Sequence, residues 1–201
     1  AYVFIAVVPI VLILTLVGMA AWAVIGQMAV YLVNTELSHH ETNLQRQADG
    51  LLRIPIREPE VAISRFAFLT RTAFPDFELL MTGENEIRYP PEAKITAPPP
   101  AWKRASGLVL KTDGGEQKLY AWAHAISDKK EVTILAPVTA DLLSKLVPGL
   151  GDVNVIPLMA HSRESHIPPP KNFFDFSLSF VNPVNIPSWD SPDKQQRLLL
   201  L

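Results

Sequence analysis

The chain has 201 residues, a formal net charge of −2 and no cysteine. The absence of cysteine excludes disulfide bonds, thiolate catalysis and zinc–thiolate sites. The near-balanced charge provides no basic face suited to nucleic acid, so we expect no nucleic-acid partner. About 170 residues follow the apolar segment at the N-terminus, which is enough for one ordinary domain.

Residues 1–33 carry no charged side chain and predict a transmembrane helix. The run is longer than the ~20 apolar residues that cross the hydrocarbon core, and Tyr2, Trp22 and Tyr31 are suitable interfacial anchors. The alternative is a secretory signal peptide with a small-x-small cleavage site at 21–23. Its apolar core would exceed the usual ~7–15 residues and no basic region is visible before it, so we favour the membrane helix.

The charges that follow this helix indicate the side of the membrane. Residues 34–52 hold one basic side chain, Arg46, against the acidic Glu36, Glu41 and Asp49. A scarcity of basic residues is typical of the translocated side, so we place the residues after 33 outside the cytoplasm. Because the chain does not begin with methionine, we expect it to be a piece of a longer protein.

Residues 34–54 predict a juxtamembrane stalk that continues the same helix. Leu37, Leu44 and Leu51 recur every seven residues and form a lengthwise apolar stripe, the leucine seam. Such a seam has two interpretations, which the spacing leaves open. Either the stalk pairs with a second subunit in a homodimer, or the seam is one face of an amphipathic helix that docks on its own domain.

Residues 55–158 predict an α+β domain with an antiparallel sheet. Pro55 and Pro59 end the stalk, because proline lacks an N–H and disfavours helix in the residue before it. The Asp113-Gly114 pair between apolar segments is a hairpin signal. The predicted elements are helices over 60–73 and 140–146, the latter N-capped by Thr139, and strands over 77–81, 86–89, 107–111, 117–126, 131–138 and 152–158. The order of these elements along the chain resembles that of PAS-like extracytoplasmic input domains, often called Cache domains.

Residues 159–201 predict a proline-rich loop and a segment that returns to the membrane, truncated at the end of the chain. Within it, the alternating residues 173–180 predict one more strand. Residues 198–201 form an apolar run, which we interpret as the start of the return.

Alternation along one predicted strand suggests a ligand site. Tyr120, Trp122 and His124 project from a single sheet face, and aromatic rings with a polar tip are suitable linings for a small-molecule pocket. Arg71 and Arg88 would supply a cation for an anionic ligand. The alternative is that both large aromatics are core packing and both arginines are solvated.

Two histidine clusters invite a metal-site interpretation, which we do not favour. Glu36, His39 and His40 share a helix face, but the sequence offers no matching carboxylates elsewhere. We interpret them as a solvated juxtamembrane face. His161 and His166 lie in a polar segment that we interpret as a solvated loop, so we predict no metal ligand and no catalytic residue in this chain.

Three stretches resemble a narrower family. They are TELSHHETNLQRQADGLLR, VTILAPVTADLLSKLVPGLGDV and IPPPKNFFDFSLSFVNPVNIPSWDSP. Together they are similar to the N-terminal half of a bacterial membrane-bound phosphatase family. The resemblance implies an anchor in the inner (cytoplasmic) membrane, an extracytoplasmic sensor region, a second membrane helix, a HAMP linker and a cytoplasmic PPM-type serine/threonine phosphatase domain. Its manganese- or magnesium-binding aspartates would then follow Leu201, with no cofactor in the present segment.

These observations predict the input region of a transmembrane signalling protein. The expected partners are the membrane, a second subunit at the stalk and a small-molecule ligand. A sensor histidine kinase with a similar input half is one alternative to the phosphatase. A membrane-tethered envelope protein without a catalytic partner is another.

Overall fold

The computed structural model describes residues 2–53, 59–100, 102, 105–146, 155–158, 182–191 and 195–200. Three helices lie in these ranges, α1 (Tyr2–Arg53), α2 (Pro59–Thr70) and α3 (Ala140–Leu146). The strands are β1 (Glu78–Thr82), β2 (Ile87–Tyr89), β3 (Ser106–Asp113), β4 (Glu116–Ser127), β5 (Lys130–Pro137), β6 (Val155–Leu158), β7 (Asn182–Pro187) and β8 (Gln195–Leu200). The predicted α+β class is confirmed.

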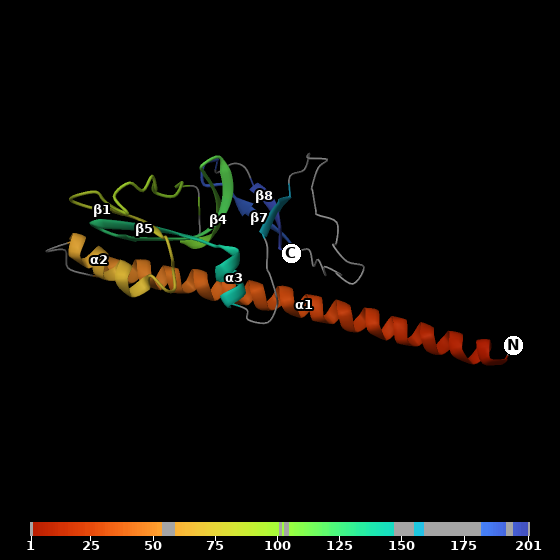
Figure 1. Ribbon diagram of the computed structural model, residues 1–201. Coiled ribbons are helices and arrows are strands. Elements are labelled where there is room, and N and C mark those ends of the chain that lie inside the picture. Colours follow the sequence, from red (N-terminus) through yellow and green to blue (C-terminus); the bar gives the residue numbers. More distant parts are fainter. Residues whose placement is uncertain are drawn as a thin grey trace.

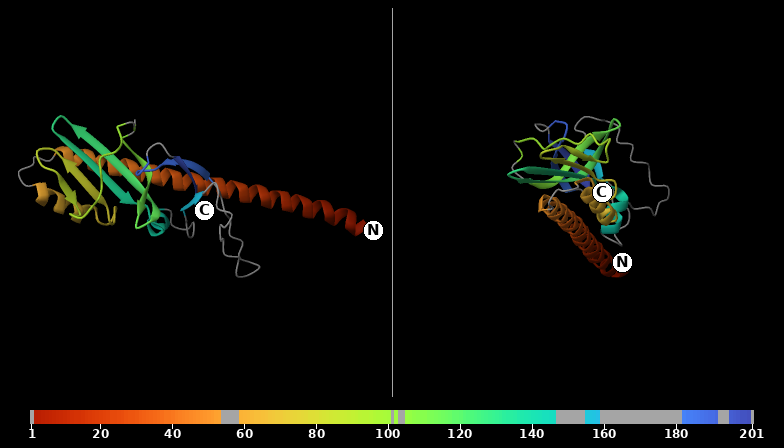
Figure 2. Two further views of the ribbon diagram at one scale, coloured as in Figure 1. Left: turned by 90° about the horizontal axis from the view of Figure 1, so that it is seen from above. Right: turned by 90° about the vertical axis from the view of Figure 1, so that its left-hand side faces the viewer.

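The helix α1 is one continuous rod of 52 residues, so the predicted membrane helix and stalk form a single element. At 1.5 Å per residue it is about 78 Å long, and its N-terminal half extends well beyond the rest of the protein (Figures 1 and 2). That half is long and apolar enough to cross a membrane, and its most apolar stretch is uncovered. The C-terminal half lies along the sheet.

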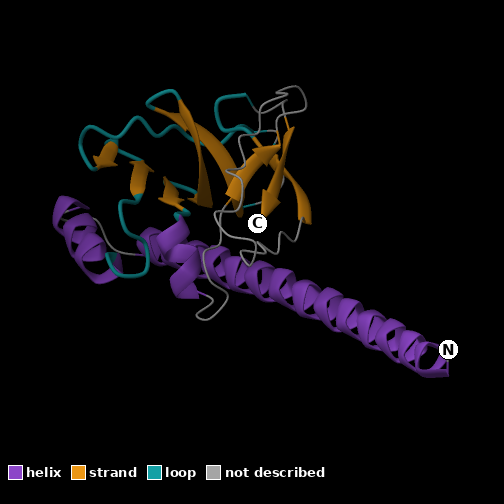
Figure 3. Cartoon of the chain, turned by 45° about the vertical axis from the view of Figure 1, so that its right-hand side comes forward, coloured by secondary structure: helices purple, strands orange, loops and turns teal. Residues whose placement is uncertain are grey.

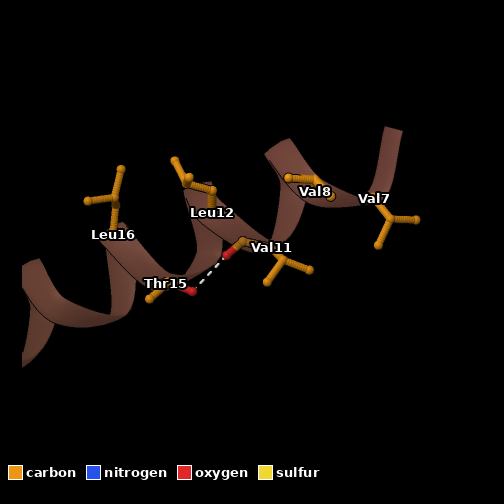
Figure 4. A pocket seen from close by; sticks show the side chains of 6 residues that line it. All are labelled: Val7, Val8, Val11, Leu12, Thr15 and Leu16. Carbon is orange, nitrogen blue, oxygen red and sulfur yellow. Dashed lines mark hydrogen bonds between the residues drawn. The ribbon is translucent and has the colours of Figure 1, made fainter. Parts of the chain in front are cut away.

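The uncovered half of α1 carries one shallow hollow of about 460 Å³, which Figure 4 shows from close by. Its lining comes from this helix alone, from Val7 to Leu16, and consists of aliphatic side chains and Thr15. The Thr15 hydroxyl donates to the Val11 carbonyl at 2.8 Å, which satisfies it within the helix. The hollow is therefore the space between side chains of one bare helix, and we assign it no ligand.

A five-stranded antiparallel sheet with the order β2-β1-β5-β4-β3 forms the body of the domain. The β3–β4 hairpin turns at Gly114 and Gly115, whose φ angles of 62° and 88° lie in the left-handed region that glycine adopts without strain. The N–H of Leu142 donates to the Thr139 hydroxyl at 3.2 Å, so the predicted N-cap of α3 is confirmed. Local turn and cap signals thus set these boundaries.

The sheet has a separate core on each face. On the inner face, α1 packs against the alternate residues Leu119, Ala121, Ala123 and Ala125 of β4. Figure 3 shows the strands lying to one side of this helix. On the outer face, Tyr120 and Trp122 pack with the proline-rich segment after β2 and with Trp189. The period of two along β4 therefore serves both cores.

The leucine seam lies inside this protomer. Leu37, Leu44 and Leu51 are buried in the inner core, and Leu44 is 0% exposed. The second interpretation, docking on its own domain, is therefore the one that the structure has. The three leucine side chains are therefore covered within one protomer. Pairing of the stalk with a second subunit stays a prediction.

The C-terminal segment differs from the prediction of a loop returning to the membrane. Strands β6, β8 and β7 pair as a small antiparallel sheet, and most of the 198–201 run belongs to β8. Its residues pair with both neighbours, which a membrane-entering helix could not do. The predicted strand over 173–180 lies outside the described residues, as does the start of the one predicted over 152–158.

Candidate functional site

A groove of about 600 Å³ lies between α2 and the beginning of β1, and we call it the α2 groove. Its lining comes from α2, from the connection between α2 and β1, and from the end of β2. Figure 1 shows α2 beside the end of the sheet that holds β1. A volume of this size accommodates a small organic molecule. The lining residues are Ser64, Ala67, Phe68, Arg71, Phe74, Asp76, Phe77, Glu78, Tyr89 and Pro90.

Aromatic rings form the apolar part of the α2 groove. Phe77 stacks on Tyr89 with ring centroids 5.3 Å apart, and Phe66 meets Phe77 edge-on at 5.4 Å from behind. Phe68 stands on the outer side of α2 and is 80% exposed. A flat apolar ligand could lie against such rings, because aromatic faces favour offset stacking and edge contacts.

Charged groups of both signs border the same groove. Arg71 and Asp76 are exposed, and Asp76 has a φ of 55°, which is uncommon for a residue other than glycine. Glu78 already forms an ion pair, because the Lys111 ammonium donates to its Oε2 at 2.6 Å. Of the five residues predicted to bind a ligand, Arg71 lies in the groove and the other four lie elsewhere.

The Glu78–Lys111 pair joins β1 to β3, although β5 and β4 lie between these strands in the sheet. Both side chains are mostly withdrawn from water, and Lys111 also lies over the Tyr120 ring at 5.6 Å. The pair therefore spans the outer face of the sheet over the Tyr120 ring. Removing one partner would leave a charge with little solvent and no counterion.

Glu78→Gln is therefore expected to lower the free energy of unfolding near neutral pH by on the order of 2 kcal/mol, because it strands the Lys111 ammonium. Chemical denaturation of the detergent-solubilised chain measures this loss. The matched control is Glu86→Gln, which breaks a 2.7 Å pair with Arg88 that is far more exposed. The control should cost less than about 1 kcal/mol. Equal losses for both variants would contradict the assigned role of Glu78.

Tyr120 and Trp122 are inside the outer core, as the core-packing alternative states. Trp122 is 3% exposed and lies 5.0 Å from the Trp102 ring and 6.1 Å from the Trp189 ring. We call these three residues the tryptophan cluster. Trp122 therefore packs the sheet against one earlier segment, which holds Trp102, and one later segment, which holds Trp189. Burial raises the pKa of the Tyr120 hydroxyl.

His124 projects from the same face, but it is partnered by side chains of the neighbouring strand. Its Nδ1 lies 2.9 Å from the Thr133 hydroxyl, and its Nε2 lies 3.2 Å from a Glu131 oxygen. Burial lowers the pKa of His124, and the Glu131 carboxylate partly opposes that shift. The Thr82 hydroxyl donates to the other Glu131 oxygen at 3.3 Å, so a polar chain crosses three strands.

Arg88 holds the proline-rich segment in place. Its Nε lies 2.7 Å from a Glu86 carboxylate oxygen, and one terminal nitrogen donates to the carbonyls of Ala93 and Ile95 at 3.1 and 2.8 Å. Arg88 is therefore neither a lining of the α2 groove nor simply a solvated side chain. The guanidinium satisfies backbone oxygens of a loop that has no sheet partner, which is a structural task.

The prediction of a solvated face is wrong for His40. This side chain is 7% exposed, and its ring centroid lies 4.6 Å from that of Phe74, a residue of the α2 groove. His39 is exposed as predicted. Spacing could have identified His40, because it lies three residues after Leu37 and four before Leu44, on the buried stripe. Within the described ranges, no three histidine or acidic side chains gather as a metal site.

Comparison with known proteins adds no assignment to this geometry. No family model, curated protein or solved structure matches the chain.

Proposed function

We propose that this chain is the extracytoplasmic input region of a membrane-anchored signalling protein. One observation carries the proposal: α1 is both the apolar helix able to span a membrane and a wall of the inner core. No flexible joint separates the two roles, because α1 is helical throughout from Tyr2 to Arg53. A rearrangement of the sheet domain would therefore be passed to the membrane as a shift of one rigid rod.

In this proposal the domain is PAS- or Cache-like, and the α2 groove is its ligand site. The groove combines aromatic walls with Arg71, which has no partner among the described residues. A small molecule that prefers one of two arrangements of α2 against the sheet would shift their populations. Signalling by population shift requires such a differential affinity.

The C-terminal segment provides the second connection. The N–H of Trp189 donates to the Leu110 carbonyl, and that of Thr112 donates to an Asp190 oxygen, both at 2.7 Å. These bonds attach the segment to β3, while α1 covers the inner face of the same sheet. We propose that this segment leads onward to a cytoplasmic output domain, a metal-dependent PPM-type phosphatase using manganese or magnesium, or alternatively a histidine kinase.

Single-cysteine labelling tests the topology, and the cysteine-free chain makes each variant report one position. Asn43→Cys lies on the exposed face of the stalk, and Val17→Cys lies in the uncovered apolar half. In spheroplasts, a membrane-impermeant maleimide is expected to label Asn43→Cys at once, and Val17→Cys only after detergent is added. Protection of Asn43→Cys until the cells are broken would place the domain in the cytoplasm and defeat the proposal.

The competing proposal is a tethered envelope protein without a catalytic partner. The two differ in what the gene encodes after Leu201. An input region requires a second apolar run of about 20 residues, within roughly the next 60 residues, to carry the signal back across the membrane. A gene that lacks such a run would favour the tethered protein.

A further inference from the structure

His40, on the stalk part of α1, contacts Phe74, which lines the α2 groove. Its imidazole ring meets the Phe74 ring at 4.6 Å with an interplanar angle of 49°. Phe74 itself is buried and lines the groove. One aromatic contact therefore joins the helix that enters the membrane to the connection between α2 and β1.

The hydrogen bonding of His40 is suited only to its neutral form. Its Nε2 is fully buried and has no hydrogen-bond partner within the described residues. A neutral imidazole can leave its acceptor nitrogen unpaired at moderate cost. A protonated imidazole has two N–H donors and a positive charge, and burying it without an acceptor costs far more.

The surrounding charges do not compensate a proton on His40. Burial is the cause that lowers its pKa, and no charged neighbour contributes to the shift. The charged side chains nearest to His40 along α1 are Glu36 and Glu41, and those nearest to Phe74 in the sequence are Arg71 and Asp76. The helix α3 carries Asp141 and Lys145. The last two pair with each other at 2.6 Å. Among the residues that the structure describes, His40 forms no ion pair that would stabilise an imidazolium ion.

We propose that the His40–Phe74 contact is a proton-operated latch between α1 and the α2–β1 connection. Above the ordinary pKa of histidine the neutral ring packs on Phe74 and the latch is closed. In a mildly acidic medium His40 takes up a proton, and the charged ring leaves Phe74 to reach water. The inference rests on this packing alone, whether or not the chain is a sensor.

The direction of the pH effect follows from linkage. The closed latch lowers the pKa of His40, so the open state binds more protons just below the ordinary value near 6.5. The latch is therefore at full strength above about pH 6.5 and weakens as the pH falls from there towards the lowered pKa. Below that value both states are protonated and no further weakening is expected.

A distance measurement between two spin labels tests the latch in the full chain, reconstituted in lipid vesicles. The labels are placed at Asn43→Cys on α1 and Thr72→Cys before Phe74, both of which are exposed. Between about pH 7.5 and about pH 5, which bracket the ordinary histidine pKa, the distance distribution is expected to gain a second, longer population. An identical distribution at both pH values would overturn the proposal.

Two variants identify the responsible histidine. His40→Phe keeps an aromatic ring against Phe74 and cannot be protonated, so the second population should disappear. His39→Gln removes the adjacent, exposed histidine and should leave the response intact. A response that survives in His40→Phe, or is lost in His39→Gln, would assign the effect to another group. If His40→Phe fails to fold, judged by the near-ultraviolet circular dichroism of the tryptophan cluster, His40→Leu takes its place.

Discussion

Replacing Trp122 by alanine is expected to lower the free energy of unfolding by about 3–5 kcal/mol. The indole is 3% exposed and packs against both the Trp102 and Trp189 rings, so truncation opens a cavity that β4 cannot close. Trp189 belongs to the segment attached to β3 by Leu110, and this attachment should loosen as well. Denaturant unfolding of the solubilised chain, followed by near-ultraviolet circular dichroism, measures both effects.

The control for this variant is Phe68→Ala, which removes an aromatic ring that is 80% exposed. Its effect on stability should stay within about 0.5 kcal/mol, because little apolar contact is lost. A large loss of stability for Trp122→Ala beside a small one for Phe68→Ala would identify Trp122 as a packing residue. A Trp122→Ala protein as stable as the parent chain would contradict the core assignment and return Trp122 to the list of candidate ligand residues.

Leu44→Ala is expected to cost about 2–5 kcal/mol, the range for a fully buried leucine. Leu44 is 0% exposed and lies at the centre of the leucine seam, where α1 covers the inner face of the sheet. The loss should be seen as weakened docking of the sheet domain on α1, while α1 itself stays helical. Far- and near-ultraviolet circular dichroism, recorded together during unfolding, distinguish these two signals.

Protein concentration provides the decisive control for Leu44. A contact within one protomer gives a loss of stability that is independent of concentration, whereas a contact between subunits gives one that depends on it. Asn43→Ala changes the adjacent, exposed position and should be nearly neutral. A concentration-dependent midpoint for Leu44→Ala would restore the interpretation of the seam as a dimer contact.

Local patterns explain most of the elements that could be predicted. An uncharged run of 33 residues, followed by leucines that recur every seven residues, indicates one long helix, and α1 is that helix. Alternation over 117–126 indicates the long strand β4, and the Asp113-Gly114 pair indicates its hairpin with β3. Each of these signals depends only on neighbours in the chain, so no knowledge of the fold was needed.

Site assignments need the tertiary structure, because they depend on which face of an element is covered. Tyr120 and Trp122 do share one face, but that face is closed by Trp102 and Trp189, which lie far from β4 in the sequence. Arg88 bonds the carbonyls of a loop whose path no periodicity describes. Spacing alone could not distinguish a pocket lining from a core, because both use the same aromatic residues.

The amino-acid sequence by itself determined the long helix, its apolar and uncharged N-terminal half, the antiparallel strands and their turns, since these follow from local polarity and backbone preference. Only the tertiary structure decided that the leucine seam covers the domain's own sheet, that His40 is buried against Phe74, and that Glu78 reaches Lys111 across the outer face. The physical reason is that burial and charge pairing arise between segments distant in the chain. A side chain's role is set by what packs on it, which its own neighbours do not encode.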